Sequence, residues 1–535
     1  MLKSLQNQPL RCCFQFHHSG AMLKSPNRLI FLRLQHSLLH NPGLIQDKIY
    51  PMKTALFFFS LLLLSSCKQE SQTETKETPP NIILIMVDDL GKEWVSHYGA
   101  EDISTPNIDA LAKSGVTFNN VYSMPQCTPT RVTLLTGQYP FKHGWVNHWD
   151  VPRWGAGAHF DETMNPSIGI AMKEAGYTTC IAGKWQIDDF RVEPDALLRN
   201  GFDEFCMWTG YESGIEASAN RYQDPYIFTK EGSKTHKGAF GPDVFKDFII
   251  DFIDHNKKSP MFIYFPMVLT HTPFVNTPTD SATDNLGKHK AMVKYTDRIT
   301  GEIIQALENA GIRDNTIVLW TTDNGTTGAI TGKRNGLKVQ GGKAKTIEPG
   351  ISVPFIASWP GTIKPNRISN ALIDFTDFYP TFLDLAGQAV QREQTINGKT
   401  YEIDGYSFKD VLLKNVDESK REWILGMGGG NNAALTQNGV ENQYLFRDRV
   451  LRNKKYKLYI NSNREPEAFF DLLQDAEESN NLIDSLNSEE RKSNFKQLYE
   501  VIATFPEKDH DPKYLPNPSQ AWDVEVTEES QLWKK

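Results

Sequence analysis

The stretch from residue 81 to residue 91, NIILIMVDDLG, has the pattern of a buried strand that ends in two carboxylates. Its apolar side chains follow one another without alternation, which is typical of a parallel strand covered on both faces. Asp88 and Asp89 come directly after the strand, where two adjacent carboxylates are costly unless a cation or hydrogen bonds compensate them. A solvated turn in which an Asp caps a helix is the alternative, but a second strand of the same form favours a metal site.

This second strand is predicted at residues 316–322, TIVLWTT, and is followed by Asp323 and Asn324. Ligands of an open α/β sheet bind in the crevice at the carboxyl ends of its strands, so we expect both polar pairs at one rim. Carboxylate and amide oxygens suit Ca²⁺ or Mg²⁺ rather than zinc. The sequence therefore predicts a site for a divalent cation.

Two more predicted strands bring polar side chains to the same rim. Residues 177–182 are followed by Lys184 and Gln186, and residues 261–268 are followed by His271. Each side chain alone would be read as a surface lysine or a buried histidine. Their common placement after strands indicates a shared site.

A cysteine opens the stretch MPQCTPTRVTLLTGQY at residues 124–139. Pro129 suits a first helical turn and Gly137 suits a C-cap, so Cys127 is predicted at the N-terminus of a short helix. Helix N-termini favour anions. Arg131, one turn on, returns toward the same end and can bind oxygens with its planar fork. An isolated cysteine in this setting would be read as a half-buried thiol.

The string Cys-x-Pro-x-Arg with its trailing Leu-Thr-Gly resembles the maturation signature of the type I (formylglycine-dependent) sulfatases, in the alkaline phosphatase superfamily. The Asp-Asp and Asp-Asn pairs, Gly-Lys-Trp before Gln186, and the block Gly-Gly-Lys…Glu-x-Gly at 341–350 resemble further motifs of that family. The resemblance covers roughly residues 80–485. Within the family, the chain resembles the polysaccharide sulfatases of bacteria.

This resemblance implies an α/β fold of the alkaline-phosphatase/sulfatase type. We expect a large, mostly parallel or mixed sheet flanked by helices, and a smaller C-terminal α+β domain with an antiparallel sheet. The expected organisation is a 1–51 upstream extension, a 52–66 signal peptide, a 67–80 tether, an 81–387 catalytic domain, a 388–505 C-terminal subdomain and a 506–535 tail. Helices are expected at 106–113, 292–310, 375–385 and 488–503, a strand at 351–358 and a hairpin at 450–460.

The resemblance also implies roles for the residues at the rim. Cys127 would be oxidised by a maturase to formylglycine (3-oxoalanine), whose hydrate attacks sulfur with one hydroxyl and, through the other, releases sulfate as the aldehyde re-forms. The expected ligands of Ca²⁺, with Mg²⁺ as the alternative, are Asp88, Asp89, Cys127, Asp323 and Asn324. Arg131, Lys184 and Lys343 would hold the sulfate, and His271 would protonate the leaving oxygen.

Gln186 departs from the family pattern, which has His after Gly-Lys-Trp. In the family this His contacts the formylglycine and helps to eliminate sulfate. Glutamine can keep a hydrogen bond but cannot take a proton. We predict that Gln186→His retains or raises activity.

Substrate contacts are expected from the aromatic and basic loop at residues 145–159, which contains Trp149 and Arg153. Aromatic rings stack on sugars and cations meet sulfates or uronates, although a partly buried aromatic loop fits the pattern equally. Gln186 and His143 are further candidates, and a structural turn is the alternative role of His143. We expect a sulfated polysaccharide, with algal glycans such as ulvan first, then carrageenan, fucoidan or glycosaminoglycans.

The N-terminal region resembles a bacterial lipoprotein signal. A basic start at Lys53, a short apolar run at 55–64 and Leu-Ser-Ser before Cys67 predict an exported protein that is lipidated at Cys67, faces the periplasm or the cell surface and is anchored to a membrane by this lipid. Export permits disulfides, and Cys180–Cys206 is a candidate pair. Cys127 is then the odd thiol.

Net charge excludes one class of function. The chain carries a formal charge of −8, and its basic N-terminal segment makes the remainder more acidic still, which argues against nucleic-acid binding. An anionic substrate must therefore be captured by local cations. Two other functions stay open: a phosphoester or phosphonate hydrolase of the same superfamily, and a catalytically impaired glycan-binding lipoprotein.

Overall fold

The computed structural model describes residues 79–146, 159–210, 212, 214–428, 433–436, 439–442, 446–509 and 520–522. The predicted lipidation site Cys67 and the predicted substrate contacts Trp149 and Arg153 lie outside these residues.

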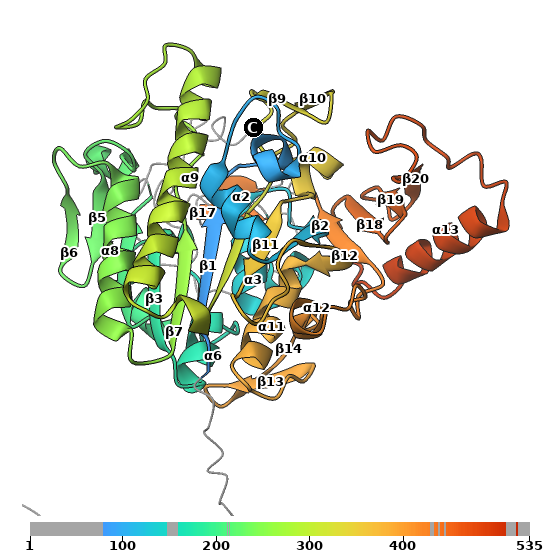
Figure 1. Ribbon diagram of the computed structural model, residues 1–535. Helices are drawn as coiled ribbons and strands as arrows, with labels where there is room; N and C mark the ends of the chain where they lie inside the picture. Colours follow the sequence, from blue (N-terminus) through green and yellow to red (C-terminus); the bar gives the residue numbers. More distant parts are fainter. Residues whose placement is uncertain are drawn as a thin grey trace, which may run out of the picture. The chain divides into compact units, whose positions relative to one another are not determined.

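A mixed ten-stranded sheet is the centre of the fold (Figure 1). Its order is β12 (Arg367–Asp374), β2 (Val116–Tyr122), β11 (Phe355–Ser358), β8 (Thr316–Thr322), β1 (Asn81–Val87), β7 (Met261–Pro266), β3 (Thr178–Lys184), β4 (Glu204–Trp208), β5 (Tyr226–Thr229) and β6 (Gly232–Thr235). The five strands from β8 to β4 are parallel, whereas β11 and β5 run antiparallel to their neighbours. This confirms the predicted mostly parallel or mixed sheet.

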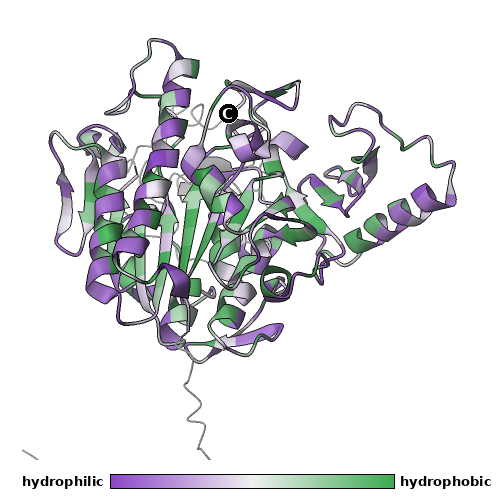
Figure 2. Ribbon diagram, in the orientation of Figure 1, coloured by the Kyte–Doolittle hydropathy of each residue, from purple (hydrophilic) through white to green (hydrophobic). Residues whose placement is uncertain are grey.

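Helices cover both faces of the sheet, and the pleat of β1 explains why its whole run is apolar. Ile83, Ile85 and Val87 pack into the core beneath α2 (Pro106–Lys113), α8 (Gly241–Asn256) and α9 (Asn285–Asn309). The alternate side chains Ile82, Leu84 and Met86 pack with α3 (Cys127–Thr136), α6 (Ile168–Glu174), α11 (Phe378–Leu385) and α12 (Lys409–Leu413). Figure 2 shows the apolar strands between these two layers.

The predicted elements agree with the structure except at some of their ends. The expected strand at 351–358 is shorter, because α10 (Glu348–Ile351) occupies its start and Pro354 has no N–H for the ladder. The expected helix at 292–310 begins earlier, where the Asp284 side chain accepts a hydrogen bond from Gly287 N–H and caps α9.

A smaller antiparallel sheet follows, as predicted. Its strands are β15 (Ile424–Met427), β18 (Arg449–Arg452), β19 (Tyr456–Ile460) and β20 (Pro466–Asp471), with α13 (Glu489–Ile502) packed on them. Three hairpins complete the described strands: β9 (Thr331–Arg334) with β10 (Leu337–Gln340), β13 (Glu393–Ile396) with β14 (Lys399–Glu402), and β16 (Ala433–Thr436) with β17 (Gly439–Asn442).

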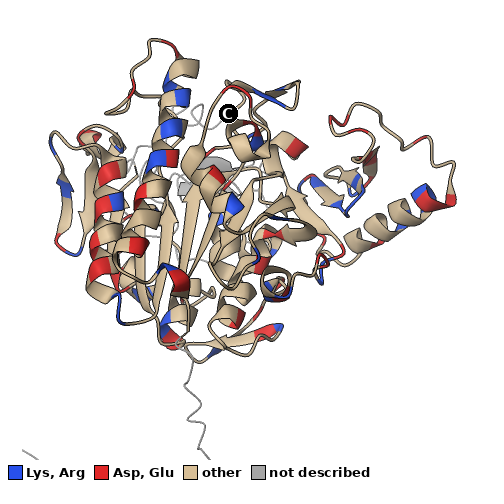
Figure 3. Ribbon diagram, viewed as in Figure 1, with Lys and Arg blue, Asp and Glu red and all other residues tan. Residues whose placement is uncertain are grey.

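Charged residues lie mainly on helices and loops, and the central strands β1, β7 and β8 contain none (Figure 3). The carboxylates that follow β1 and β8 are therefore local exceptions in an apolar layer. In the part of the chain that the structure describes, no helix combines the length and apolar character of a membrane span.

Candidate active site

The two predicted acidic pairs meet. Val87 and Thr322 are register partners in the parallel strands β1 and β8, so the residues that follow them leave the sheet side by side. The N–H of Asp89 donates to Asp323 Oδ1 over 3.1 Å. Asn324 Nδ2 donates to Asp89 Oδ1 over 2.8 Å.

Helix α3 places Cys127 and Arg131 at this cluster. Cys127 is the first residue of the helix and is buried, and Gly137 ends the helix with a left-handed φ of 65°. Arg131 Nη2 lies 2.6 Å from Asp323 Oδ2, and its Nη1 donates to the Lys184 carbonyl over 3.2 Å. The predicted position of Cys127 at a helix N-terminus is confirmed.

Three further side chains complete the rim. Lys184, the last residue of β3, donates to Asp88 Oδ2 over 2.7 Å. Lys343, on the loop before α10, donates to Asp89 Oδ2 over 2.5 Å. His271 Nε2 lies 3.7 Å from the same Asp89 oxygen. These side chains come from separate strands and loops, and they contact one another at the edge of the sheet where the sequence predicts them.

Burial and neighbouring charge set the pKa values of the three carboxyls in different directions. Burial raises the pKa of Asp89, although Lys343 opposes it. Burial and then Asp88 hold the pKa of Asp323 well above its usual range. At Asp88 burial acts the same way, but Lys184 and the other nearby cations outweigh it, so the pKa of Asp88 lies well below its usual range.

The donor set fits a hard divalent cation. Asp88 Oδ1 and Asn324 Oδ1 are buried and have no hydrogen-bond partner among the described residues, which a bound ion would correct. Ligand atoms of Asp88, Asp89 and His271 also lie within 4.8 Å of one another. Three cationic side chains already balance the three carboxylates, so a bound divalent ion would leave the cluster positive and favour an anionic substrate.

His271 is held by two residues that sequence reasoning missed. The hydroxyl of Tyr222 lies 2.5 Å from the His271 carbonyl oxygen and 2.8 Å from the Val268 carbonyl oxygen. Arg221 donates to the Thr272 carbonyl while its guanidinium stacks on Trp208 at 4.3 Å. Nothing in the sequence around Arg221 and Tyr222 marks this role, because the contacts are to backbone atoms about 50 residues away in the chain.

The imidazole of His271 presents Nε2 to the cluster. Its Nδ1 lies 2.7 Å from the Thr272 carbonyl oxygen, which fixes the proton on Nδ1 and leaves Nε2 as the acceptor in the neutral ring. Burial, followed by repulsion from Lys343, holds the pKa of His271 well below its usual range.

Two predicted substrate contacts lie within the described residues. Gln186 follows Lys184 by two residues, is half-buried and has a left-handed φ of 73°. His143 is fully buried, with Nε2 3.2 Å from Thr133 Oγ1 and Nδ1 accepting from the Trp145 N–H. This burial matches the structural turn that the sequence also allowed, and the substrate role of His143 stays a prediction.

The candidate disulfide is not formed. Cys180 and Cys206 lie on the adjacent strands β3 and β4, but both are buried thiols. Burial, with a contribution from Cys206, holds the pKa of Cys180 well above its usual range.

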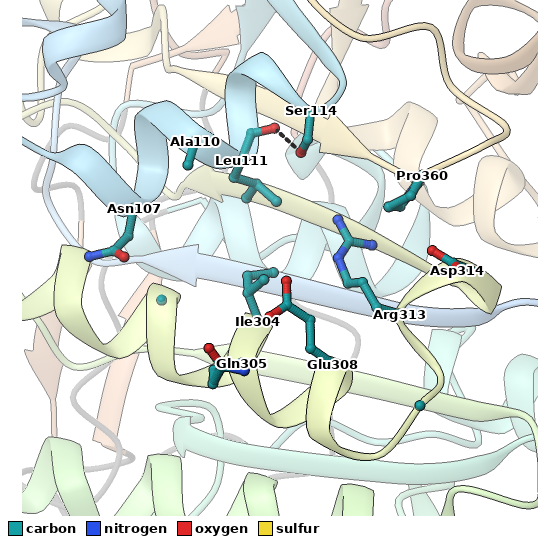
Figure 4. Close-up of a pocket in the computed structure, with 12 residues that line it drawn as sticks. Asn107, Ala110, Leu111, Ser114, Ile304, Gln305, Glu308, Arg313, Asp314 and Pro360 are labelled. Carbon is teal, nitrogen blue, oxygen red and sulfur yellow. Dashed lines mark hydrogen bonds between the residues drawn. The ribbon is translucent and has the colours of Figure 1, made fainter.

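A cavity of about 600 Å³ between α2 and α9 contains none of the predicted catalytic residues (Figure 4). Arg313 lines it together with Asn107, Glu308 and Pro360. Its guanidinium donates to the Thr316 carbonyl over 2.8 Å and to Ser358 Oγ over 2.6 Å. These partners belong to the amino end of β8 and the carboxyl end of the antiparallel β11, which is the end of the sheet opposite to Asp88 and Asp323.

Comparison with known families identifies the protein family to which this chain belongs. The Sulfatase family model matches residues 80–388, and the model described as N-sulphoglucosamine sulphohydrolase, C-terminal, matches residues 343–504. The chain belongs to the sulfatase family. Members of this family are sulfuric ester hydrolases, and the first model includes every residue of the cluster described above.

Sulfatases from animals and bacteria are similar to this chain. N-acetylgalactosamine-6-sulfatase of Rattus norvegicus is 31% identical, over 60% of this chain and 64% of its own length. The chain thus spans less than two thirds of the animal relatives it matches. N-acetylgalactosamine-6-O-sulfatase of Bacteroides thetaiotaomicron is 28% identical over 79% of this chain and 93% of its length. An ulvan-active sulfatase of Formosa agariphila is 27% identical over 82% and 79%.

Solved sulfatase structures share the fold. The crystal structure of Ps i-CgsB in complex with k-i-k-neocarrahexaose superposes with a TM-score of 0.66 at 25% identity. The match covers 82% of this chain and 95% of that one. This sulfatase fold includes the large sheet and the smaller antiparallel sheet.

Proposed function

We propose that this protein hydrolyses sulfate esters of a sulfated polysaccharide or of its oligosaccharides. The observation that carries the proposal is the contact of two acidic pairs with Arg131, Lys184 and Lys343 at the start of the helix that Cys127 opens. Such a site combines ligands for a divalent cation with donors for an anion.

The nucleophile would be formylglycine, made from Cys127 by a formylglycine-generating maturase. Its hydrate would supply an attacking hydroxyl, and a bound Ca²⁺ would orient this hydroxyl and neutralise charge on the sulfuryl oxygens. Asp88, Asp89, Asp323, Asn324 and residue 127 would hold the ion. The unpartnered oxygens of Asp88 and Asn324 support this assignment.

The cations of the cluster would bind and orient the sulfate group. Lys184 and Lys343 donate to one carboxylate oxygen of Asp88 and of Asp89, and each ammonium has further N–H donors for the substrate. Arg131 would keep both of its hydrogen bonds, from Nη2 to Asp323 and from Nη1 to the carbonyl of Lys184. The net positive charge of the filled site would exclude neutral esters.

His271 would protonate the leaving oxygen from its doubly protonated form, which a bound anion stabilises, because Nε2 of the neutral ring carries no proton. Its Nε2 is the ring nitrogen that faces the cluster, and the contacts of Tyr222 with backbone carbonyls hold the loop that carries the ring. Gln186 would contribute a hydrogen bond beside the nucleophile but no proton transfer.

The substrate class is supported by the relatives, which are named for sulfated sugars of animal and algal glycans. We favour an algal glycan such as ulvan, with Trp149 and Arg153 as contacts. We further propose that the protein is an exported lipoprotein, anchored through Cys67, that degrades polysaccharide at the periplasmic face or the cell surface.

Co-expression with a maturase tests this function. Mass spectrometry of the Cys127 peptide should detect the aldehyde, and the protein should hydrolyse 4-nitrophenyl sulfate faster than 4-nitrophenyl phosphate. A chelator should abolish turnover and lower the Tm, and Ca²⁺ should restore both. Faster phosphate turnover would indicate the phosphoester hydrolase instead, and an unmodified thiol without turnover would indicate the glycan-binding protein.

Defined oligosaccharides test the substrate. Ulvan, carrageenan and 6-sulfated N-acetylgalactosamine oligosaccharides, assayed for released sulfate, should separate the alternatives. Activity on ulvan fragments above all others is expected, and activity confined to the amino sugar would overturn the algal assignment.

A further inference from the structure

A second cavity, of about 540 Å³, lies apart from the catalytic cluster. Its walls come from η2 (Lys92–Trp94), the end of β2, the β9–β10 hairpin, α10, β18 and the turn after β20 (Figure 1). The cavity thus lies between the large sheet and the smaller antiparallel sheet. No residue with a proposed catalytic role lines it.

Arg452, at the end of β18, lines this cavity with an incompletely bonded guanidinium. Its side chain is 5% exposed and stacks on the ring of Tyr122 at 4.7 Å. Nη2 has a long hydrogen bond of 3.3 Å to Asn120 Oδ1, whereas Nε and Nη1 are buried without a partner. Buried donors without acceptors are rare, because each costs about 1–3 kcal/mol.

Two other cations face the same space without a hydrogen-bonded carboxylate. Lys92, 6% exposed, donates to the Asn119 carbonyl over 2.8 Å and to Ser352 Oγ over 2.7 Å, both neutral acceptors. Arg334 donates Nε–H to the Tyr98 carbonyl. Burial, followed by repulsion from Arg334, lowers the pKa of Lys92 to about 7.

The nearest carboxylates already have hydrogen-bond partners. Glu93 lines the same cavity, accepts from Thr326 Oγ1 over 2.5 Å and has a pKa that burial raises. Glu348 accepts from Tyr122 Oη over 2.8 Å and from Lys457 over 3.2 Å, and it remains 3.9 Å from Arg452 Nη1. Glu478 lies 2.8 Å from the same Lys457 nitrogen and accepts from the Glu348 N–H. These bonds leave Nε and Nη1 of Arg452 without an acceptor among the described residues and Lys92 without a hydrogen-bonded carboxylate.

The cavity in Figure 4 provides a contrast, because Arg313 there has a backbone carbonyl and a serine hydroxyl as acceptors. A buried arginine in a cavity wall is therefore compatible with a completed network in this protein. Burial in a cavity wall alone therefore does not explain the missing acceptors at Arg452.

We propose that this cavity is a second anion site, in which Arg452, Lys92 and Arg334 bind an oxyanion, a sulfate or carboxylate group. Asn119, Asn120 and Gln340 line the same space and supply amide groups for the hydroxyls of an attached sugar. The oxyanion is either free sulfate or the acidic group of a glycan unit. The proposal does not depend on catalysis.

Calorimetric titration of the full chain with sodium sulfate tests the site. Asn120→Asp is the most informative variant, because it places a carboxylate beside Arg452 and removes no buried cation. Wild-type protein should bind two sulfate ions and Asn120→Asp one, with turnover of 4-nitrophenyl sulfate unchanged. Arg452→Met should also bind one, and Arg313→Met, which alters the other cavity, should bind two.

The source of the oxyanion is tested in a Cys127→Ala background, which prevents turnover. If a glycan unit is the ligand, a sulfated oligosaccharide should bind at least about tenfold more weakly when Asn120→Asp is added, a loss of about 1.4 kcal/mol. If free sulfate is the ligand, only the titration with inorganic sulfate should change. Equal stoichiometry and affinity in wild type and Asn120→Asp for both ligands would overturn the proposal.

Proton uptake supplies an independent readout. Sulfate binding at pH 8 should draw protons from the buffer, since the anion stabilises the charged form of Lys92. Titrations in buffers of different ionisation enthalpy should detect this uptake in wild type and not in Lys92→Met. Identical uptake in the two proteins would exclude Lys92 from the site.

Discussion

Two clusters of buried charge in this protein resemble each other in composition and differ in completeness. The first joins Arg421 to Asp374 and Asp377, and the second joins Arg131, Lys184 and Lys343 to the acidic pairs after β1 and β8. In the first, Arg421 contacts Asp377 through Nε and Nη2, and its Nη1 lies 3.0 Å from Asp374. The two aspartates also form a capping box for η6 (Phe375–Asp377).

The two clusters differ in whether they contain buried polar atoms that lack a hydrogen-bond partner. No side-chain nitrogen or oxygen of Arg421, Asp374 or Asp377 is buried without a partner, whereas Asp88 Oδ1 and Asn324 Oδ1 are. A completed network holds two parts of the chain together, and an incomplete one keeps ligand positions open. The distinction predicts that damage to the first cluster affects stability and damage to the second affects chemistry.

The largest effect is expected at the nucleophile. Cys127→Ala should lower kcat by at least about 10⁴-fold, the scale seen when a catalytic nucleophile is removed. Turnover of 4-nitrophenyl sulfate, with the Tm as a check on folding, measures it. Cys180→Ala removes another buried thiol and should leave kcat within a few fold; comparable losses in both variants would contradict the assignment.

Arg421→Met is the test of the completed cluster. It leaves Asp374 and Asp377 buried without their cation, so the free energy of unfolding should fall by about 3–5 kcal/mol. Chemical denaturation measures this, while kcat per folded molecule should stay unchanged. Arg392→Met removes an exposed arginine that pairs with Glu402 at 3.1 Å and should cost at most about 1 kcal/mol.

Lys184→Met is the matching test of the incomplete cluster. Loss of one charged donor to the sulfate should lower kcat by about 10²–10³-fold. Loss of the ion pair with the buried Asp88 should lower the free energy of unfolding as well. Lys173→Met serves as the control, because this exposed lysine pairs only with Asp203 on the surface. A large drop in Tm without a drop in kcat would assign Lys184 to stability instead.

Glu212 extends the comparison to a third buried charged group. It lies outside both clusters, and its carboxylate oxygens have no hydrogen-bond partner in the described part of the chain. Its side chain is 2% exposed, both carboxylate oxygens have no hydrogen bond, and Arg191 Nε is 3.9 Å away. Burial raises the pKa of Glu212 from 4.5 to about 7, so the folded protein favours the protonated form. Its contribution to stability is present below pH 4.5 and is lost as the pH rises through 7.

Glu212→Gln should therefore gain stability relative to wild type between pH 5 and pH 8, by at most about 3 kcal/mol. Denaturation of both proteins at the two pH values measures the change. The control Glu500→Gln alters an exposed residue of α13 and should show no such trend. A constant difference between Glu212→Gln and wild type would contradict the raised pKa.

The smallest effect is expected at Gln186. Gln186→His restores a group that can take a proton and should leave kcat equal or raise it a few fold, measured on the same aryl sulfate. Gln186→Leu removes the hydrogen bond and should lower kcat. Loss of activity in Gln186→His would assign glutamine a role of its own.

The incomplete cluster was more predictable from the sequence than the completed one. Strands β1 and β8 have the bounds expected from their apolar runs, and the acidic pairs directly follow them. Local order in the chain therefore placed the proposed metal ligands at this edge of the sheet. The sequence offers no such signal for Arg421, whose carboxylate partners lie 44 or more residues away on a different element.

Side-chain contacts to backbone atoms, and contacts between segments far apart in the chain, could not be predicted from the sequence either. Tyr222 binds carbonyl oxygens of the loop that carries His271, and any sequence provides such oxygens. The sequence does not distinguish Arg452 from other arginines, because its contact with Tyr122 depends on where β18 lies in the fold. Prediction succeeded where a buried strand forces the next residues to a known edge, and failed where tertiary packing chooses the partner.

The burial of Cys127 has a consequence for the order of events in the cell. Its side chain is 2% exposed and its backbone opens a helix whose every residue is buried. The proposed oxidation of Cys127 would need the thiol in an accessible segment, and the folded chain does not offer one. Oxidation would then have to precede folding, so the speed at which this domain closes would limit how much of the protein becomes active.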